Sequence, residues 1–207
     1  MFFNPSVYLS ALMLSAGQII GIGPQNAYVI RQGLGRSHVA PIVVICVVCD
    51  ILLISAGVFG MGSLIAGLPL FVKTVTWLGA AFMFWLAYKA FRAALAPSGL
   101  TLSDSVERDR KAVIRTILAV TLLNPYVWLD TVVLIGSLSS AYGPGSQLSF
   151  ILGCITASIT WFVAIGFFSG KLAPVFEKPA SWRVLDLVIG VVMLLTGTVL
   201  LRNFGFQ

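Results

Sequence analysis

The chain has 207 residues, of which 58% are hydrophobic and 10% are charged, and its mean hydropathy is +1.00. This composition excludes a soluble globule, because so few polar side chains cannot cover its surface, and it indicates an integral membrane protein. The formal net charge of +6 does not indicate nucleic-acid binding, because the basic residues lie between apolar runs and form no basic face or strip.

The amino-terminal residues and the cysteines predict neither a cleaved leader nor a metal site. No Lys or Arg precedes the first apolar run and there is no small-residue cleavage motif, so we expect no removed signal peptide. Cys46, Cys49 and Cys154 lie inside apolar runs, where cysteine usually packs as a small buried hydrophobe. Cys46 and Cys49 form a C-x-x-C pair, but no second pair or nearby His completes a ligand set. We therefore expect no metal and no cofactor.

Six apolar segments are each long enough to cross a bilayer as a helix, which takes about 20 residues. They cover residues 6–30, 39–66, 69–91, 113–139, 147–170 and 184–203. A charged linker, 93–112, separates a first half, 1–92, from a second half, 113–207. The sequence therefore predicts an all-α integral membrane protein with a single transport domain over residues 1–207.

Polar, helix-breaking residues interrupt the first and the fourth of these segments in mid-span. The interruptions are Gly21-Ile22-Gly23-Pro24-Gln25-Asn26 and Asn124-Pro125-Tyr126-Val127-Trp128-Leu129-Asp130. An unpaired backbone group in hydrocarbon is costly, so broken helix at this depth is tolerated only where protein buries it or where it lines a cavity. Paired breaks in corresponding segments of two halves therefore predict a transport site.

The two halves share one layout, in which three segments follow each other and the first is broken. Because three is odd, a duplicated three-segment unit crosses the membrane in the opposite direction the second time. Pro24 breaks the first half and Pro125 the second, with Asn26 and Asn124 within two residues of these prolines. We therefore expect six transmembrane helices as two inverted three-helix repeats, with a broken first helix in each repeat.

The distribution of Lys and Arg predicts the orientation of the chain. Eleven basic residues lie around the first, third and fifth loops, namely Arg31, Arg36, Lys89, Arg92, Arg108, Arg110, Lys111, Arg115, Lys171, Lys178 and Arg183. Only Lys73 and Arg202 lie on the other side. Cytoplasmic loops are enriched in Lys and Arg, so we expect these three loops in the cytoplasm and both termini outside.

Two carboxylates lie inside the predicted spans. Asp50 is near the middle of the second segment, and Asp130 follows the Pro125 break. An Asp at a helix centre costs roughly 2.5–3.5 kcal/mol on insertion scales, so it faces the bundle interior or water and is a functional candidate. No Lys or Arg lies deep enough in a span to neutralise either acid. Such an acid can exchange a proton or hold an incoming cation; the alternative is a structural role, capping a broken helix or bonding a hydroxyl.

Further polar groups surround the two breaks. With the two acids and the breaks themselves, the predicted substrate-binding residues are Gln18, Gly23, Pro24, Gln25, Asn26, Asp50, Asn124, Pro125, Tyr126 and Asp130. The amino end of a half-helix favours a carboxylate and the carboxyl end a cation, and an α-amino acid has both groups. For the fifth segment, with Thr156, Ser158 and Thr160, we expect core packing, because Ser and Thr commonly bond their own helix carbonyls.

Three stretches of the chain together resemble a known family. They are the run from Gln18 to Gly33, which contains G-x-G-P-Q-N, the pair Cys49-Asp50, and the run from Leu123 to Thr131, which contains L-N-P-Y-x-x-L-D. They are similar to the LysE/ArgO family of bacterial lysine and arginine exporters, over essentially the whole chain. The resemblance implies efflux of basic amino acids across the inner membrane, driven by the proton-motive force or the membrane potential. It also implies that Asp50 and Asp130 are important residues.

Other functions remain open on the sequence. Members of the wider superfamily export neutral amino acids such as threonine or homoserine, so the resemblance indicates transport more firmly than substrate. An intramembrane aspartyl protease also needs two Asp residues on facing spans, but neither acid lies in a G-x-G-D string. A structural or accessory membrane protein would use the breaks only for packing. Small residues near the second segment, Gly57, Gly60, Gly62 and Gly67, could form a close contact within the chain or in a homodimer.

Overall fold

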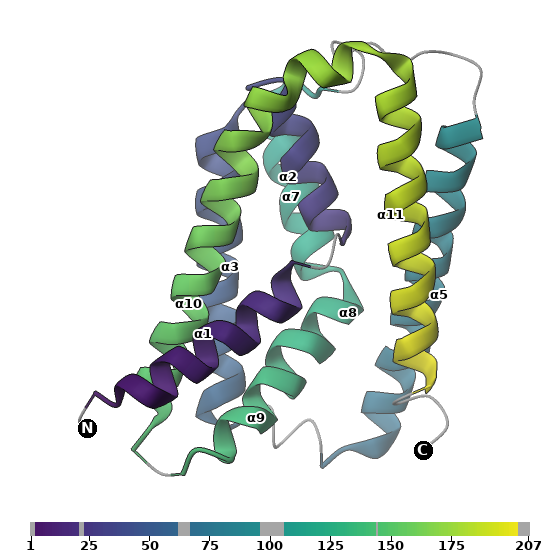
Figure 1. Cartoon of the computed structure of the whole chain (residues 1–207). Coiled ribbons are helices and arrows are strands. Elements are labelled where there is room, and N and C mark those ends of the chain that lie inside the picture. The colour runs from purple at the N-terminus through teal and green to yellow at the C-terminus, as the bar shows by residue number, and fades with distance from the viewer. Residues whose placement is uncertain (1–2, 21–22, 62–66, 96–105, 144, 203–207) are drawn as a thin grey trace.

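The computed structural model describes residues 3–20, 23–61, 67–95, 106–143 and 145–202, and the secondary structure of these ranges is entirely helical. Figure 1 shows two groups of helices. The larger group contains α1 (Pro5–Ile19), α2 (Pro24–Leu34), α3 (Val39–Ala56), α7 (Arg110–Leu122), α8 (Pro125–Val127), α9 (Gly136–Ser140) and α10 (Gln147–Val163). The smaller group is the pair α5 (Pro69–Leu95) and α11 (Pro179–Leu200), which pack side by side.

Four of the predicted spans are present as single long apolar helices among the described residues. They run over Val39–Gly60, Pro69–Leu95, Gln147–Val175 and Ala180–Leu200. The first predicted span consists of α1 and α2, which meet at an angle of 79° and together count as a fifth. The prediction of an all-helical membrane protein is confirmed, although residues 62–66 of the second predicted span lie outside the described residues.

The fourth predicted span, 113–139, is broken between Leu122 and Pro125, which confirms the predicted interruption. It is divided into α7, which has 13 residues, and a shorter apolar helical run, Trp128–Ser140, and neither is long enough to cross a membrane alone. The reason is the backbone at the break: α7 ends at Leu122 and α8 begins at Pro125, and a proline supplies no N–H for a continuous helix. The helix also begins at Arg110, so the solvated linker is shorter than the predicted 93–112.

Polar side chains and prolines explain where several helices begin. The Oδ1 atom of Asn4 accepts hydrogen bonds from the backbone N–H groups of Ser6 and Val7 at the start of α1. Asp109 does the same for the first turn of α7. Both α2 and α11 begin with a proline. A proline has no backbone N–H, and at the first position of a helix this group would have no partner within the helix.

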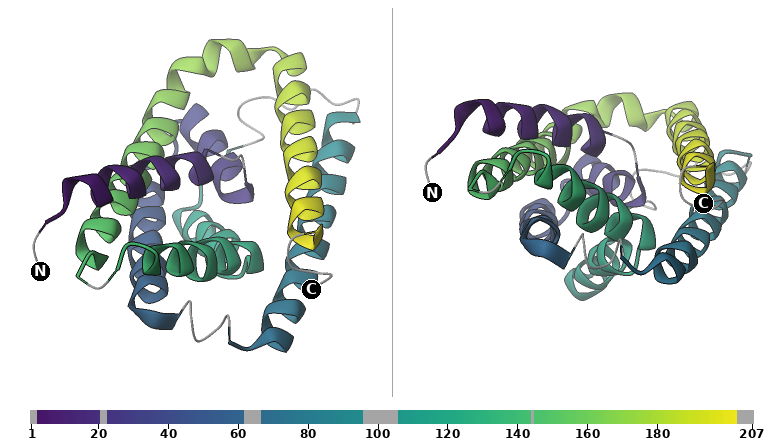
Figure 2. Two further views of the ribbon diagram at one scale, coloured as in Figure 1. Left: turned by 60° about the horizontal axis from the view of Figure 1, so that its bottom comes forward. Right: turned by 90° about the horizontal axis from the view of Figure 1, so that it is seen from below.

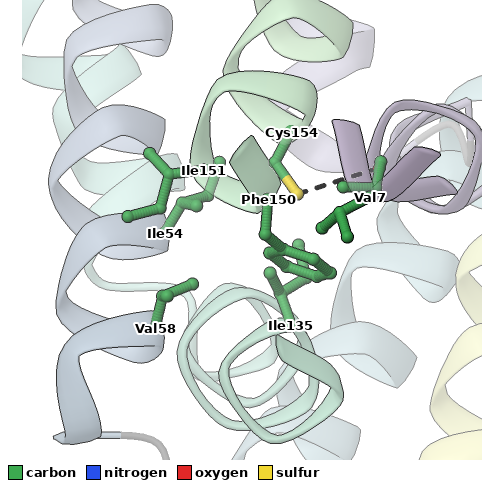
Figure 3. Packing of buried hydrophobic residues seen from close by; sticks show 8 residues of the cluster. Val7, Ile54, Val58, Ile135, Phe150, Ile151 and Cys154 are labelled. Atoms are coloured by element: carbon green, nitrogen blue, oxygen red, sulfur yellow. Dashed lines mark hydrogen bonds between the residues drawn. The ribbon is translucent and has the colours of Figure 1, made fainter. Parts of the chain in front are cut away.

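The larger group packs through close helix crossings. Figure 1 shows α1 lying obliquely across α10, and both helices contribute to the buried cluster drawn in Figure 3. The cluster consists of Val7, Ala11, Ile54, Val58, Ile135, Phe150, Ile151 and Cys154. A Cβ atom on Gly153 of α10 would lie 2.4 Å from the carbonyl oxygen of Tyr8, so this crossing requires glycine.

Two further crossings also depend on glycine. A Cβ atom on Gly136 would lie 2.6 Å from the carbonyl oxygen of Gly57, where α9 meets the π-helical segment η1 (Gly57–Met61). A Cβ atom on Gly33 of α2 would lie 2.5 Å from the carbonyl oxygen of Gly166, in the π-helical segment η3 (Ala164–Phe168). The contact of Gly57 is therefore made within the chain, whereas Gly62 lies outside the described residues.

The connections of the chain lie at two opposite ends of the molecule. Figure 1 shows the start of α1 and the end of α11 toward the lower end, and the connections α2–α3 and α10–α11 at the upper end. The upper connections contain Arg36, Lys171 and Lys178, whereas Lys73 belongs to the first turns of α5 at the lower end. The basic residues thus gather at one end of the helices. The two views in Figure 2 show the pair α5 and α11 beside the larger group.

Candidate functional site

The two predicted breaks meet at one cavity inside the larger group of helices. Its volume is about 90 Å³. It is lined by Ser15, Gln18, Ile19, Gly23, Pro24, Gln25, Asn26, Asp50, Ile54, Asn124, Tyr126, Val127, Asp130, Thr131 and Ile135. Nine of the ten predicted site residues therefore face one space, although they come from four separate stretches of the chain; Pro125 is not among the lining residues.

The first break presents the amino end of α2 to this cavity. Gly23 has an extended backbone, with φ −78° and ψ 176°, and Pro24 opens the helix after the 79° turn from α1. No side chain caps the first turn of α2. The amino end of a helix has a partial positive charge and backbone N–H groups directed outward, so this part of the cavity favours a carboxylate.

The second break is held by two local hydrogen bonds. The backbone N–H of Tyr126 donates to Oδ1 of Asn124 over 3.1 Å. The indole N–H of Trp128 donates over 2.8 Å to the carbonyl oxygen of Leu122, one of the last carbonyls of α7. The π-helical segment η2 (Trp128–Ile135) follows and contains Asp130. These bonds satisfy backbone groups that the broken helix leaves without their usual partners.

Asp50 and Asp130 both line the cavity, and neither forms an ion pair among the described residues. Asp50 lies on α3, is 8% exposed, and accepts a hydrogen bond of 2.6 Å at Oδ2 from Oγ of Ser158 on α10. Asp130 accepts a longer hydrogen bond, 3.4 Å, at Oδ1 from Nε2 of Gln18. Because both acids line the same cavity, a cation bound there would be attracted by both carboxylates.

The amide side chains of the first break differ in what they bind. Nδ2 of Asn26 donates to the carbonyl oxygen of Ile19 over 2.8 Å, and its Oδ1 accepts from the indole N–H of Trp161 over 3.3 Å. Asn26 thus ties the two sides of the bend together and to α10. By contrast, Oε1 of Gln18 and Nε2 of Gln25 are buried without a hydrogen-bond partner among the described residues. Buried polar atoms of this kind are available to a ligand.

The polar residues of the fifth segment are only partly core residues. Thr156 donates to the carbonyl oxygen of Leu152 on its own helix, as predicted. The prediction is wrong for Ser158, whose hydroxyl donates to Asp50 on another helix. The two residues are 108 positions apart, and Ser158 occupies a place in the fifth segment similar to that of Asp50 in the second. A comparison of the two halves could have found it.

Sequence reasoning missed a second charged site. Asp186 of α11 forms an ion pair with the guanidinium Nη2 of Arg31, in the last turn of α2. The two residues line a cavity of about 380 Å³ between α2 and the pair α5 and α11. A third cavity, of about 270 Å³, lies between η2 and α11 and shares Tyr126 and Asp130 with the central one. No signal in the sequence pairs Arg31 with Asp186, which are 155 positions apart.

Comparison with known protein families adds independent information. The family model described as LysE type translocator matches residues 18–204. The chain belongs to the LysE type translocator family. The match includes both breaks, both acids of the central cavity and Asp186, so the predicted family resemblance is confirmed. Like other LysE type translocators it is a transporter and not an enzyme, which sets aside the aspartyl protease and the accessory protein.

Several curated relatives cover nearly the whole chain. It is 40% identical over 189 residues to an arginine exporter protein, ArgO, of Pectobacterium atrosepticum, which is 91% of this chain and 93% of the relative. Identity to the ArgO proteins of Pectobacterium carotovorum and Serratia proteamaculans is 39% and 38%, over 91% of this chain and over 93% and 92% of the relatives. No solved structure matches the fold. The family and the long apolar helices together indicate that this LysE type translocator is a multi-pass protein of the inner membrane.

Proposed function

We propose that this translocator exports basic amino acids, arginine or lysine or both, by secondary active transport. The observation that carries the proposal is the pair of acids, Asp50 and Asp130, on one cavity whose lining among the described residues contains no Lys or Arg. Buried carboxylates without a fixed partner are costly unless a cation binds them. The relatives named arginine exporters support the same substrate class.

The cavity suggests how the substrate binds. The side-chain cation lies between Asp50 and Asp130, and the α-carboxylate lies at the uncapped amino end of α2. The unpaired amide atoms of Gln18 and Gln25 complete the polar contacts. At about 90 Å³ the cavity is smaller than ligand pockets, which usually enclose roughly 300–1,000 Å³. Binding therefore requires the two breaks to move apart.

The inverted-repeat arrangement is part of the proposal. It is supported by two matching crossings, in which the helical run after each break meets a π-helical segment at the end of the second span of the other half. In one crossing, α2 meets η3 through Gly33 and Gly166. In the other, α9 meets η1 through Gly136 and Gly57. Two three-helix units of opposite orientation would produce such a match, and alternating access could then move one unit against the other.

Orientation and coupling follow from the charges. We place the end with Arg36, Lys171 and Lys178 in the cytoplasm and both termini outside, by the rule that cytoplasmic loops are rich in Lys and Arg. Uncompensated carboxylates can also exchange protons, so export coupled to the proton-motive force or the membrane potential, as antiport, fits the site. A homodimer contact would have to use small residues other than Gly57, since Gly57 makes its close contact within the chain.

Counterflow of radiolabelled arginine in proteoliposomes tests the substrate site. We expect Asp50→Asn and Asp130→Asn each to lower kcat/KM for arginine by about tenfold or more, because a hydrogen bond to a charged group contributes roughly 1.5–3 kcal/mol. Glu107→Gln is the matched control, since it makes the same chemical change at an exposed position outside the cavity. Wild-type rates in both aspartate variants would contradict the proposal.

Export of a neutral amino acid such as threonine or homoserine is the second candidate function. It is favoured by the apolar side chains of Ile19, Ile54, Val127 and Ile135 on the same cavity. A competition panel of arginine, lysine, canavanine, threonine and leucine separates the two candidates. Inhibition by the first three alone supports export of basic amino acids, whereas inhibition by threonine or leucine at equal concentration supports the neutral alternative.

A further inference from the structure

The ion pair of Arg31 and Asp186 connects the two groups of helices at the basic end of the molecule. Asp186 lies on α11 and its side chain is 2% exposed, whereas the side chain of Arg31 on α2 is 29% exposed. Breaking such a pair by removing one partner leaves a buried charge, while replacing both partners with apolar residues is often neutral. Fold stability therefore gives no strong reason for charges at this place, and a function for them has to be considered.

The cavity around this pair has the size and the chemistry of a binding site for a basic amino acid. Its volume of about 380 Å³ is within the usual range of ligand pockets, roughly 300–1,000 Å³. Leu86, Ile189 and Met193 form apolar walls that suit the methylene groups of such a side chain. Lys89 lies on the lining too, with its ammonium 4.5 Å from the centre of the Trp85 ring.

The guanidinium of Arg31 is the same chemical group that arginine, as a substrate, would bring to Asp186. A carboxylate binds a guanidinium through parallel hydrogen bonds, and an arginine side chain binds the α-carboxylate of an amino acid in the same way. When a substrate cation takes the place of Arg31 on Asp186, the freed Arg31 can bind the substrate carboxylate. All charges then stay paired during the exchange.

We propose that Asp186 is a loading site that binds the side-chain cation of the substrate. Arg31 pairs with this carboxylate in the cavity between α2 and the pair α5 and α11, and the substrate displaces Arg31 from it. This inference rests on the proposed export of basic amino acids and deepens it. Arg31 and Asp186 thereby join α2 to α11 only while the loading site holds no substrate.

The loading site lies next to the central one. Pro24 lines both cavities, at the point where α2 begins. The central cavity in turn shares Tyr126 and Asp130 with the third cavity, toward α11. A substrate released from Asp186 therefore moves along α2 to Asp50 and Asp130. Release of the ion pair also frees α2 to move, which is the motion that the small central cavity requires.

The test is the double variant Arg31→Met/Asp186→Leu, which removes both charges and keeps apolar packing. Arginine transport is measured from each face, in inside-out and right-side-out vesicles. We expect KM at the cytoplasmic face to rise by about tenfold or more, because a charge-assisted contact is lost there, with KM at the outer face unchanged. The control is Arg115→Met, which removes an exposed basic charge of α7 outside the cavity.

An unchanged KM at the cytoplasmic face would overturn the inference, whether or not kcat falls. A fall in kcat alone is the result that a purely structural latch would cause. If the wild type transports neither arginine nor lysine, the proposed function fails as well. If the wild type transports arginine and the double variant matches it, only the loading site fails.

A second measurement keeps the ion pair intact and does not depend on the folding of the double variant. Ala93→Cys places a thiol on the lining of the loading cavity, while the three native cysteines are buried. We expect saturating arginine to slow the labelling of this thiol by a cationic thiol reagent several-fold, and leucine to leave it unchanged. Equal labelling with and without arginine would overturn the inference.

Discussion

The two acidic sites of this translocator differ in whether a cation of the protein itself occupies them. Asp186 has a resident partner, Arg31, in a cavity of about 380 Å³. Asp50 and Asp130 have only a hydroxyl and an amide as partners, in a cavity of about 90 Å³. A site with its own cation is closed to substrate until that cation leaves, whereas a site without one is free for a passing cation. Under the proposal, Asp186 therefore serves loading, whereas Asp50 and Asp130 serve translocation.

The largest expected effect comes from breaking the resident pair on one side only. Arg31→Met leaves Asp186 buried without a cation, so we expect the free energy of unfolding to fall by about 3 kcal/mol or more. Arg31→Met/Asp186→Leu is expected to stay within about 1 kcal/mol of wild type, since both charges are gone. Chemical unfolding in mixed micelles measures both. Equal stability of the single and double variants would show that the pair is not desolvated.

A resident cation can be introduced into the central cavity as well. Gln18→Lys brings an ammonium next to Asp130, whose Oδ1 already lies 3.4 Å from Nε2 of Gln18. We expect kcat/KM for arginine to fall by about a hundredfold, equivalent to roughly 2.7 kcal/mol, because the tethered cation competes with the substrate. Gln18→Met is the control for loss of the amide alone and should lower kcat/KM by no more than about tenfold, since a neutral hydrogen bond contributes roughly 0.5–1.5 kcal/mol. Wild-type counterflow in the Lys variant would mean that Asp130 does not bind the substrate.

The hydrogen bond of Asp50 offers a smaller change at the same site. Ser158→Ala removes the hydroxyl that donates to Oδ2 over 2.6 Å. We expect kcat/KM for arginine to fall by about tenfold, since a hydrogen bond to a charged group contributes roughly 1.5–3 kcal/mol. Thr160→Val, at an exposed position of the same helix, serves as the control. The same assay detects whether the two variants differ; if they do not, Ser158 is a packing residue.

The smallest expected effect concerns the hydrogen bond that Trp128 makes at the second break. Trp128→Phe removes the indole N–H that donates to the carbonyl oxygen of Leu122. Side-chain hydrogen bonds in membrane proteins contribute roughly 0.6 kcal/mol on average, so we expect a loss of about that size in unfolding free energy. KM for arginine should not change, which counterflow can verify. A large rise in KM would show that this tryptophan contacts the substrate.

Composition and local pattern were enough to establish the protein class and the position of the breaks. Apolar length and helix-breaking prolines are properties of neighbouring residues, so Pro24 and Pro125 could be assigned directly from the sequence. The isolated acids Asp50 and Asp130 were identified by their cost in an apolar segment. The break in the fourth span is predicted by Pro125, but apolar length alone does not show how far the break separates the two helices.

Only the tertiary structure decided which polar groups face each other. Ser158 lies 108 residues from Asp50, and Asp186 lies 155 residues from Arg31. No local spacing encodes such pairs, because they depend on how helices cross, and the crossings in turn depend on glycines such as Gly33 and Gly136. Hydrophobicity therefore predicts that a helix lies in the membrane, while the partner of a buried charge is determined by packing between segments that are distant in the chain.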